Sequence, residues 1–226
     1  MGYIGSTPTA VPLTGSDLAD SIITSAKIAD GTIVNADVNA SAAIVSTKLA
    51  TPSIWTSIST TTISNDATVD ITGLDSTKYT DYKFICRGIT SANEAVVFQL
   101  QLSDDAGSTF ETTSYAYIHK SEIMDATEAA SRTGSASSDV CNLMFGLGSV
   151  ASTDSASCVV DLIDPHSTSQ FTYGFSVGAT NRDDDTEHGE NSWFQRYVLV
   201  DHDAVRFKGN AGNLKTGTIE LLGLAI

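Results

Sequence analysis

The sequence predicts an all-β protein in which an N-terminal extended arm and a short repeat stem precede an antiparallel β-sandwich of jelly-roll-like type. The composition is rich in Thr, Ser, Val, Ile and Gly, with 17% charged residues and four prolines, which favours strands over helices. Apolar segments of alternating polarity recur after position 51, separated by Gly, Asp, Asn and Ser turns. A self-similar segment precedes them. These observations divide the chain into an arm (1–15), a stem (16–50) and a head (51–226).

The first segment contains Pro8 and Pro12 and too few apolar side chains to build a core, so we expect an extended arm. Arms of this kind become ordered when they lie on another protein. The residues expected to make this attachment are Tyr3, Ile4, Val11 and Leu13. A disordered terminus is the alternative that the composition leaves open.

The stem contains an internal repeat: residues 19–28 align with residues 29–38, and residues 39–49 form a third, slightly longer copy. Each copy ends in a large apolar, a small and a large apolar residue, and nothing within the copy can cover this edge. Such a unit is stabilised by neighbouring repeats or by other chains. With three short copies we expect other chains. Interleaved strands and a brief helical bundle both remain open for the stem.

A boundary at Thr51-Pro52-Ser53 separates the stem from the head, where the pattern becomes that of strands. The clearest is 95–102, in which apolar and polar residues alternate. The other expected strands are 54–63, 68–71, 79–88, 110–119, 140–147, 157–163, 170–177, 193–200, 204–208 and 216–224. One helical interruption is expected at 121–130, inside a polar connection that runs to Ser138. About ten short strands with such turns are typical of a sandwich or jelly roll.

Residues 103–110, Ser-Asp-Asp-Ala-Gly-Ser-Thr-Phe, resemble the Asp-box (Ser-x-Asp-x-Gly-x-Thr-aromatic) of sialidases and other β proteins. Asp105 can accept hydrogen bonds from backbone amides that follow it, and Gly107 can adopt a positive φ, so the segment predicts a hairpin turn. The resemblance implies no catalytic residue within the box. A sialidase would need several copies and an arginine cluster, whereas the chain has one copy.

The chain is strongly acidic: 12 Lys and Arg face 27 Asp and Glu, for a formal charge of −15. This argues against nucleic acid or an anionic membrane as the main partner. No segment reaches the roughly 18 apolar residues of a membrane helix, so we expect no membrane insertion. The densest acidic run contains Asp183, Asp185 and Glu187, whose alternating carboxylates form a candidate calcium site. The competing interpretation is a solvated charge run, because the other ligands of a calcium loop are missing.

Few residues fit a catalytic role. The four histidines lie in or beside turns, and none belongs to a nucleophile or zinc motif. We therefore expect no enzyme, no catalytic residue and no cofactor, with calcium the single candidate ion, although a carboxylate pair for glycoside cleavage is left open. Cys86, Cys141 and Cys158 each lie in an apolar stretch and are expected to be free buried thiols.

An aromatic set, Tyr115, Tyr117 and His119 with Trp193 and Tyr197, has two interpretations. Aromatic rings stack on the C–H face of a pyranose, so the set can hold a sugar. Large aromatic residues at alternating positions are more often core residues. We favour the core interpretation.

Two stretches carry a resemblance to a known class of proteins. Residues 28–44, Ile-Ala-Asp-Gly-Thr-Ile-Val-Asn-Ala-Asp-Val-Asn-Ala-Ser-Ala-Ala-Ile, resemble the stem repeats of tail-fibre and related virion proteins of tailed bacteriophages. Residues 204–224 are similar to the closing strands of phage fibre head domains, with Asn213 and Gly217 at turn positions and Leu222 in place of the usual aromatic residue. The resemblance implies a homotrimer whose N-terminus attaches to the particle. The trimer interface would then consist of Ile23, Ile28, Ile33, Val38, Ile44 and Leu49.

The leading hypothesis from the sequence is a non-enzymatic phage virion protein, assembled in the host cytoplasm. In this hypothesis the trimeric fibre is joined by its arm to another virion protein, a tail or capsid component. Its β-sandwich is presented to a glycan or protein of the host surface. Two alternatives are a capsid (head) fibre or decoration protein and a small tailspike that degrades polysaccharide.

Overall fold

The structure is a computed structural model that describes residues 20–21, 23–39, 42, 55–123, 131–149, 154–181 and 187–226. It divides the chain into two units, Met1–Ala50 and Thr51–Ile226, and each is described by itself. In the second unit the strands are β1 (Trp55–Asp66), β2 (Thr68–Thr72), β3 (Tyr79–Ser91), β4 (Val96–Ser103), β5 (Tyr115–Ile123), β6 (Ser131–Ser138), β7 (Cys141–Leu147), β8 (Ala156–Ile163), β9 (Thr172–Asn181), β10 (Glu187–Arg196), β11 (Ala204–Gly209) and β12 (Leu214–Ala225).

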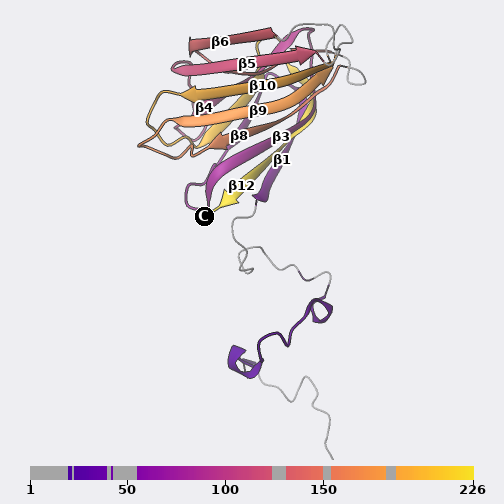
Figure 1. The fold of residues 1–226 in the computed structure, drawn as a ribbon, viewed down its shortest axis with the longest axis vertical. Helices are drawn as coiled ribbons and strands as arrows, with labels where there is room; N and C mark the ends of the chain where they lie inside the picture. The colour runs from indigo at the N-terminus through magenta and orange to yellow at the C-terminus, as the bar shows by residue number, and fades with distance from the viewer. Residues whose placement is uncertain are drawn as a thin grey trace, which may run out of the picture. The chain divides into compact units, whose positions relative to one another are not determined.

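The strands form two antiparallel sheets. The large sheet has the order β1-β12-β3-β8-β9-β10-β5-β6 and the small sheet the order β2-β11-β4-β7, with β4 seen behind the large sheet in Figure 1. Most connections pass from one sheet to the other; β5–β6 and β8–β9–β10 stay within the large sheet. The described residues contain no α-helix. The chain is therefore all-β with two antiparallel sheets, as in a β-sandwich, and this part of the sequence prediction is confirmed.

The core lies between the two sheets and is built from the inward residues of both. The Phe207 ring of β11 packs against Phe84 of β3, with centroids 5.3 Å apart, and stacks on Phe98 of β4 at 5.4 Å. All three rings are fully buried. Tyr115 of β5 joins the layers a second time, because its hydroxyl oxygen accepts a hydrogen bond of 2.7 Å from the backbone NH of Leu102 in β4. Packed aromatic side chains of this size contribute a large share of a core's stability.

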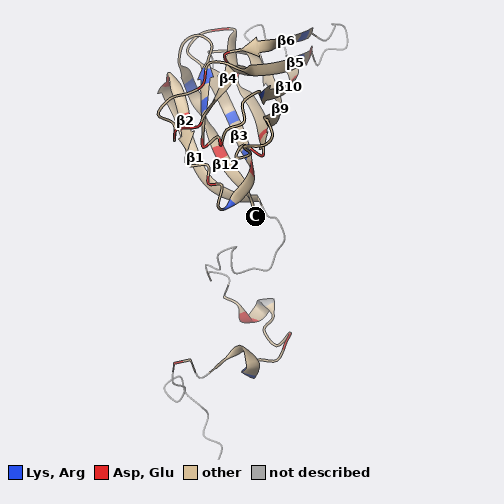
Figure 2. Cartoon of the chain, turned by 90° about the vertical axis from the view of Figure 1, so that its left-hand side faces the viewer, with Lys and Arg blue, Asp and Glu red and all other residues tan. Residues whose placement is uncertain are grey.

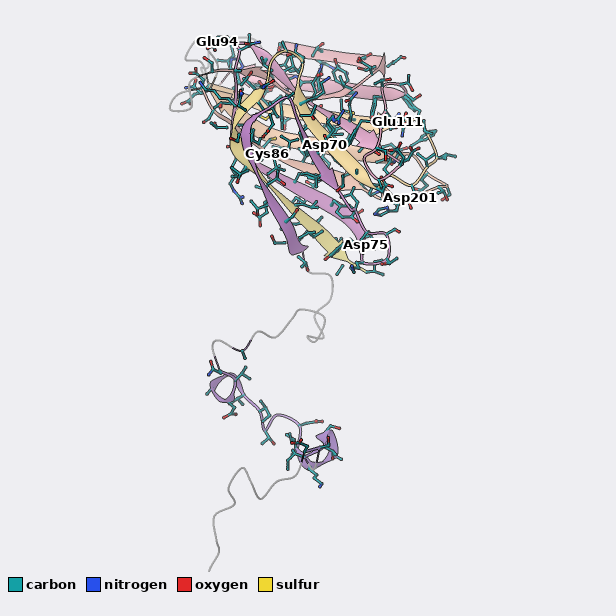
Figure 3. All side chains as sticks on the ribbon, turned by 180° about the vertical axis from the view of Figure 1, so that it is seen from behind. Asp70, Asp75, Cys86, Glu94, Glu111 and Asp201 are labelled. Atoms are coloured by element: carbon teal, nitrogen blue, oxygen red, sulfur yellow. The ribbon has the colours of Figure 1, made fainter. Side chains whose placement is uncertain are left out.

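Between β3 and β8, Cys86 lies directly opposite Cys158. Both thiols and that of Cys141 are buried and free, as the sequence predicted. The neighbouring Cys158 thiol, followed by burial, raises the pKa of Cys86, and burial raises the pKa of Cys141. Figure 3 shows Cys86 on its strand together with Asp70, which accepts two hydrogen bonds of 2.7 Å from the Arg206 guanidinium.

Most expected strands are present, with differences of a few residues at their ends. The region after β4 and the strand β10 are the exceptions. β5 begins at Tyr115 and not at position 110, and it continues through residues 121–123, so the helix expected from Ser121 is wrong over these three residues. Residues 124–130 lie outside the described part. β6 was expected to be a loop and is a strand, because it pairs with β5 and forms an edge of the large sheet.

β10 also differs from the prediction. The expected strand 193–200 begins in the middle of the observed one, and residues 197–200 are not a strand. The inward residues at its start are His188, Glu190 and Ser192, all buried. Polar residues on the core side hide the alternation on which the prediction depended.

The Asp-box residues form the expected turn. Asp105 accepts hydrogen bonds from the NH of Thr109 (2.8 Å), from its hydroxyl (2.7 Å) and from the hydroxyl of Ser103 (2.8 Å), which lower the pKa of the carboxyl. Gly107 has a φ of +81°, in the left-handed region that favours glycine. The turn does not join two paired strands, however, because β4 belongs to the small sheet and β5 to the large one. The hairpin part of the expectation is wrong.

In the first unit, the sequence repeat is also a structural repeat. Two 3₁₀ turns, Ser25–Lys27 and Asn35–Asp37, occupy the same place in successive copies. Ser21 (φ 64°) and Gly31 (φ 76°) have left-handed backbones at the matching place before each turn. The backbone hydrogen bond from Thr32 NH to Ala29 O recurs from Ala42 NH to Asn39 O, at 3.1 and 2.8 Å. The described stem residues of the single chain form short 3₁₀ turns and contain neither a strand nor an α-helix, and the arrangement of the stem between chains stays a prediction.

Candidate functional site

A patch of exposed apolar side chains covers the outer face of the large sheet around β5, β8, β9 and β10. It consists of Ile118, Ile163, Tyr173, Val177, Trp193 and Tyr197, all more than 40% exposed. Charge is scarce here: β9 contains no Asp, Glu, Lys or Arg and is drawn in the neutral colour in Figure 2. Contiguous exposed apolar surface on a protein commonly marks a binding site.

The patch is hollowed into a groove of about 480 Å³, which we call the aromatic groove. Its walls and floor include Trp193, Tyr173, Tyr197, Gln195, Ala116 and Gly134. The hollow exists because small residues on β5 and β6 lie next to large rings on β9 and β10. Gly134 leaves no room for a larger residue, since a Cβ there would lie 2.7 Å from the carbonyl oxygen of Tyr117.

The rings of the aromatic groove are held by cross-strand neighbours. Trp193 lies directly opposite Ile118 of β5 on one side and Phe175 of β9 on the other, while its side chain remains 53% exposed. Cross-strand pairs of this kind restrict the side chains that form them. Tyr197 contacts Phe171 edge to face, with centroids 5.7 Å apart. The groove is therefore open and its walls are supported.

Gln195 supplies a polar group among these rings. It lies opposite Tyr173 on β9 and opposite Ala116 on β5, in the same row across the sheet. A side-chain amide offers both a donor and an acceptor. Every residue that lines the groove lies in the described part of the chain, and none of them is charged at neutral pH. The groove thus combines apolar rings with neutral hydrogen-bonding groups, the usual character of a small-ligand site.

Behind the groove, the inward side of the same strands carries a buried polar layer. Glu190 of β10 accepts a hydrogen bond of 3.0 Å from Ser121 Oγ and lies 2.5 Å from Nε2 of His119. The same hydroxyl lies 3.0 Å from Nδ1 of His188. All four side chains are buried, so a substrate in the groove does not reach them. This layer positions the strands and is not part of the candidate site.

A second buried group ties β10 to the loop before β11. Nη1 of Arg196 donates to Nε2 of His202 at 2.6 Å, and Nη2 of Arg196 lies 2.9 Å from Glu111 Oε2. Burial, followed by the charge of Arg196, lowers the pKa of His202 from its ordinary value of 6.5 to about 4. His202 is therefore neutral at pH 7 and serves as a hydrogen-bond acceptor for the guanidinium.

The aromatic set predicted from the sequence separates in the structure. Tyr115 and His119 are buried and Tyr117 packs against the core, as expected. Trp193 and Tyr197 are exposed in the groove, so the core interpretation is wrong for these two residues. The reason is register: the even-numbered residues of β10 face inward, which places Trp193 on the outer face.

Other predicted site residues lie partly outside the described residues. This applies to the arm residues Tyr3, Ile4, Val11 and Leu13, to Ile44 and Leu49 of the predicted trimer interface, and to Asp183 and Asp185 of the calcium candidate. Glu187 begins β10 and is exposed. Among the described residues, no group of three His, Cys, Asp or Glu is arranged to hold a metal ion. The stem residues Ile23, Ile28, Ile33 and Val38 are exposed, and their role in a trimer stays a prediction.

Sequence reasoning missed Tyr173, Gln195, Ala116 and Gly134. For Tyr173 a signal was present, because Tyr173, Phe175 and Val177 alternate with the small residues Gly174 and Ser176 and so place three large residues on one face of the strand. Small residues on the inward side and large ones on the outer side reverse the usual pattern. Such a reversal indicates an outer face that has a function.

The fold and the groove define an all-β, sandwich-like protein with an open aromatic groove on its larger sheet. In the described part of the chain, no helix is long and apolar enough to cross a membrane. Comparisons of the chain with family models, with curated proteins and with solved structures gave no match.

Proposed function

We propose that the protein is a non-enzymatic structural protein of a phage virion: a trimeric fibre, attached to the particle by its N-terminal arm and presenting its head to the host surface. The stem carries this proposal. Four large apolar residues, Ile23, Ile28, Ile33 and Val38, recur at a regular spacing and are exposed in the single chain. Among the described stem residues no second layer covers them, so association with other chains is the way to remove them from water.

The order of the strands supports the same proposal. The small sheet packs on the large one through Phe207 of β11 against Phe84 of β3 and through β7 against β9, β10 and β5, and most consecutive strands lie in different sheets. We infer a jelly-roll-like sandwich from this order, in which β9, β10, β5 and β6 form one end of the large sheet. Jelly rolls are common in viral structural and carbohydrate-binding domains. This end of the large sheet carries the aromatic groove, so the candidate binding site lies on the outer side of strands that also cover the small sheet.

The stem is tested by the double substitution Ile33→Asp with Val38→Asp. Each aspartate places a charge at a position expected to be buried between chains, which is costly without a partner. Light scattering should show a trimer for the parent protein and a smaller species for the variant. A matched control is Thr32→Asp with Asn39→Asp, which adds the same charges at the exposed positions next to Ile33 and Val38. Equal disruption by both variants would count against the assigned interface.

The place on the particle is tested by imaging purified virions with an antibody against the head. Label at the tail supports a tail fibre. Label on the capsid facets selects the alternative of a capsid fibre or decoration protein, and absence of label from particles refutes the virion assignment. The tailspike alternative requires release of reducing ends from host polysaccharide by the purified protein.

A further inference from the structure

We propose that the aromatic groove binds a short neutral saccharide, with Trp193 as its stacking platform. This inference deepens the proposed host-recognition role and rests on it for the place where the saccharide is met. The binding itself is a property of the head. It can be measured without reference to the stem or the particle.

The walls of the aromatic groove are large rings that remain partly exposed. Trp193, Tyr173 and Tyr197 are 53%, 46% and 41% exposed, although large aromatic side chains are strongly favoured by burial. A pyranose ring has a face of C–H groups that packs on an aromatic ring, while its edge carries hydroxyl groups. Rings that are half exposed and supported from behind provide such a platform at little cost in side-chain entropy.

The polar groups of the aromatic groove match the hydroxyl groups of a sugar. Each sugar hydroxyl is both a donor and an acceptor, and so is the amide of Gln195, which lies in the same row as Tyr173. The hydroxyl groups of Tyr173 and Tyr197 add neutral groups of the same kind. A purely apolar ligand would cover the amide of Gln195 without forming a hydrogen bond to it, and covering an unpaired amide costs free energy. The amide therefore favours a ligand with hydroxyl groups.

The charge of the protein favours a neutral ligand. No lining residue is charged, and the chain as a whole carries a formal charge of −15. This field repels acidic sugars and leaves neutral ones unaffected. The volume of about 480 Å³ lies within the range of about 300–1,000 Å³ for small-ligand sites. A short neutral saccharide satisfies the shape, the rings and the charge together.

The chain contains two tryptophans, which makes a direct test available. The full-length Trp55→Phe variant retains Trp193 as its single tryptophan. Its fluorescence is titrated with maltotriose, cellotriose, chitotriose and mannotriose. A neutral glycan array, screened beforehand, selects further saccharides for the same titration. Digalacturonic acid serves as the acidic comparison. We expect a saturable change with at least one neutral saccharide and none with the acidic one.

Two substitutions in the otherwise native chain then locate the site by calorimetry. Trp193→Ala removes the platform, and Ala116→Phe fills the hollow while keeping every aromatic wall. Each should weaken binding about ten-fold or more, the equivalent of about 1.4 kcal/mol. Trp55→Ala is the matched control, because Trp55 lies on β1 at the far edge of the same sheet. It should bind like the native protein.

The proposal is overturned if no neutral glycan on the array binds, if the acidic probe binds better, or if binding survives Trp193→Ala. It is also overturned if Trp193→Ala lowers the mass of the protein in solution, because the groove would then be a contact between chains. A trimer without saccharide binding refutes this inference alone. Saccharide binding by a monomer refutes the fibre proposal alone.

Discussion

Lowering the pH from 8 to 5 should cost the head about 2 kcal/mol of unfolding free energy through one buried side chain, His202. Its Nε2 accepts a hydrogen bond of 2.6 Å from Arg196, and its Nδ1 lies 2.9 Å from the hydroxyl of Thr172 and 3.3 Å from the carbonyl oxygen of Pro165. Nδ1 therefore carries the proton of the neutral ring. A second proton on Nε2 would break the bond to Arg196 and place two cations in contact.

The magnitude follows from the pKa of His202, which falls from 6.5 to about 4 in the folded protein. Between these values the unfolded chain binds more protons than the folded one, so stability decreases as the pH falls. The full difference of about 2.5 pKa units corresponds to about 3 kcal/mol, of which about 2 kcal/mol is lost by pH 5. The contribution is complete above pH 6.5 and absent below pH 4.

The assay is urea unfolding of the native protein and of His202→Gln at pH 8 and at pH 5. Glutamine keeps an acceptor for Arg196 and does not titrate, so the variant should lose about 2 kcal/mol less than the native protein over this range. Ser176→Ala is a control that removes a buried hydrogen bond, from Ser176 Oγ to the Leu143 carbonyl oxygen, without a titrating group. It should lower stability equally at both pH values. Identical pH dependence in the native and His202→Gln proteins would refute the reasoning.

Two further predictions concern the core and the acidic loop. Phe207→Ala should lower the free energy of unfolding by about 3–5 kcal/mol, because it removes the ring between Phe84 and Phe98; a loss below about 1 kcal/mol, measured by urea unfolding, contradicts the central place of this ring. Calcium should raise the melting temperature of the native protein and leave Asp185→Ala unchanged if the acidic run binds the ion. No calcium-dependent shift in the native protein disposes of that site.

Much of the sandwich could be predicted because its core residues alternate along the strands. β4 has Val96, Phe98, Leu100 and Leu102 on its inward face, and its limits were nearly right. β6 could not be found, since Ser131–Ser138 contains no large apolar residue and, as an edge strand, needs none. Its pairing with β5 stabilises it, and pairing between distant segments leaves no mark on local composition.

The candidate site was harder to predict than the fold. Tyr115 of β5 and Trp193 of β10 are both large aromatic residues, yet one is buried and the other exposed, because the register of each strand decides which face its side chains occupy. The register could not be derived from the start of β10, where His188 and Glu190 face inward. Hydrogen bonds with Ser121 and the contact of Glu190 with His119 hold this polar layer, and they depend on contacts between strands that no local pattern contains.

The native mass of the full-length protein tests the central claim most directly. A chain of 23.7 kDa gives about 71 kDa for a trimer, which sedimentation equilibrium separates from a monomer or a dimer. We expect the trimer mass, independent of dilution into the nanomolar range, with the exposed apolar residues of the stem covered by neighbouring chains. A mass of 23.7 kDa would contradict it, because Ile23, Ile28, Ile33 and Val38 would then have no partner chain.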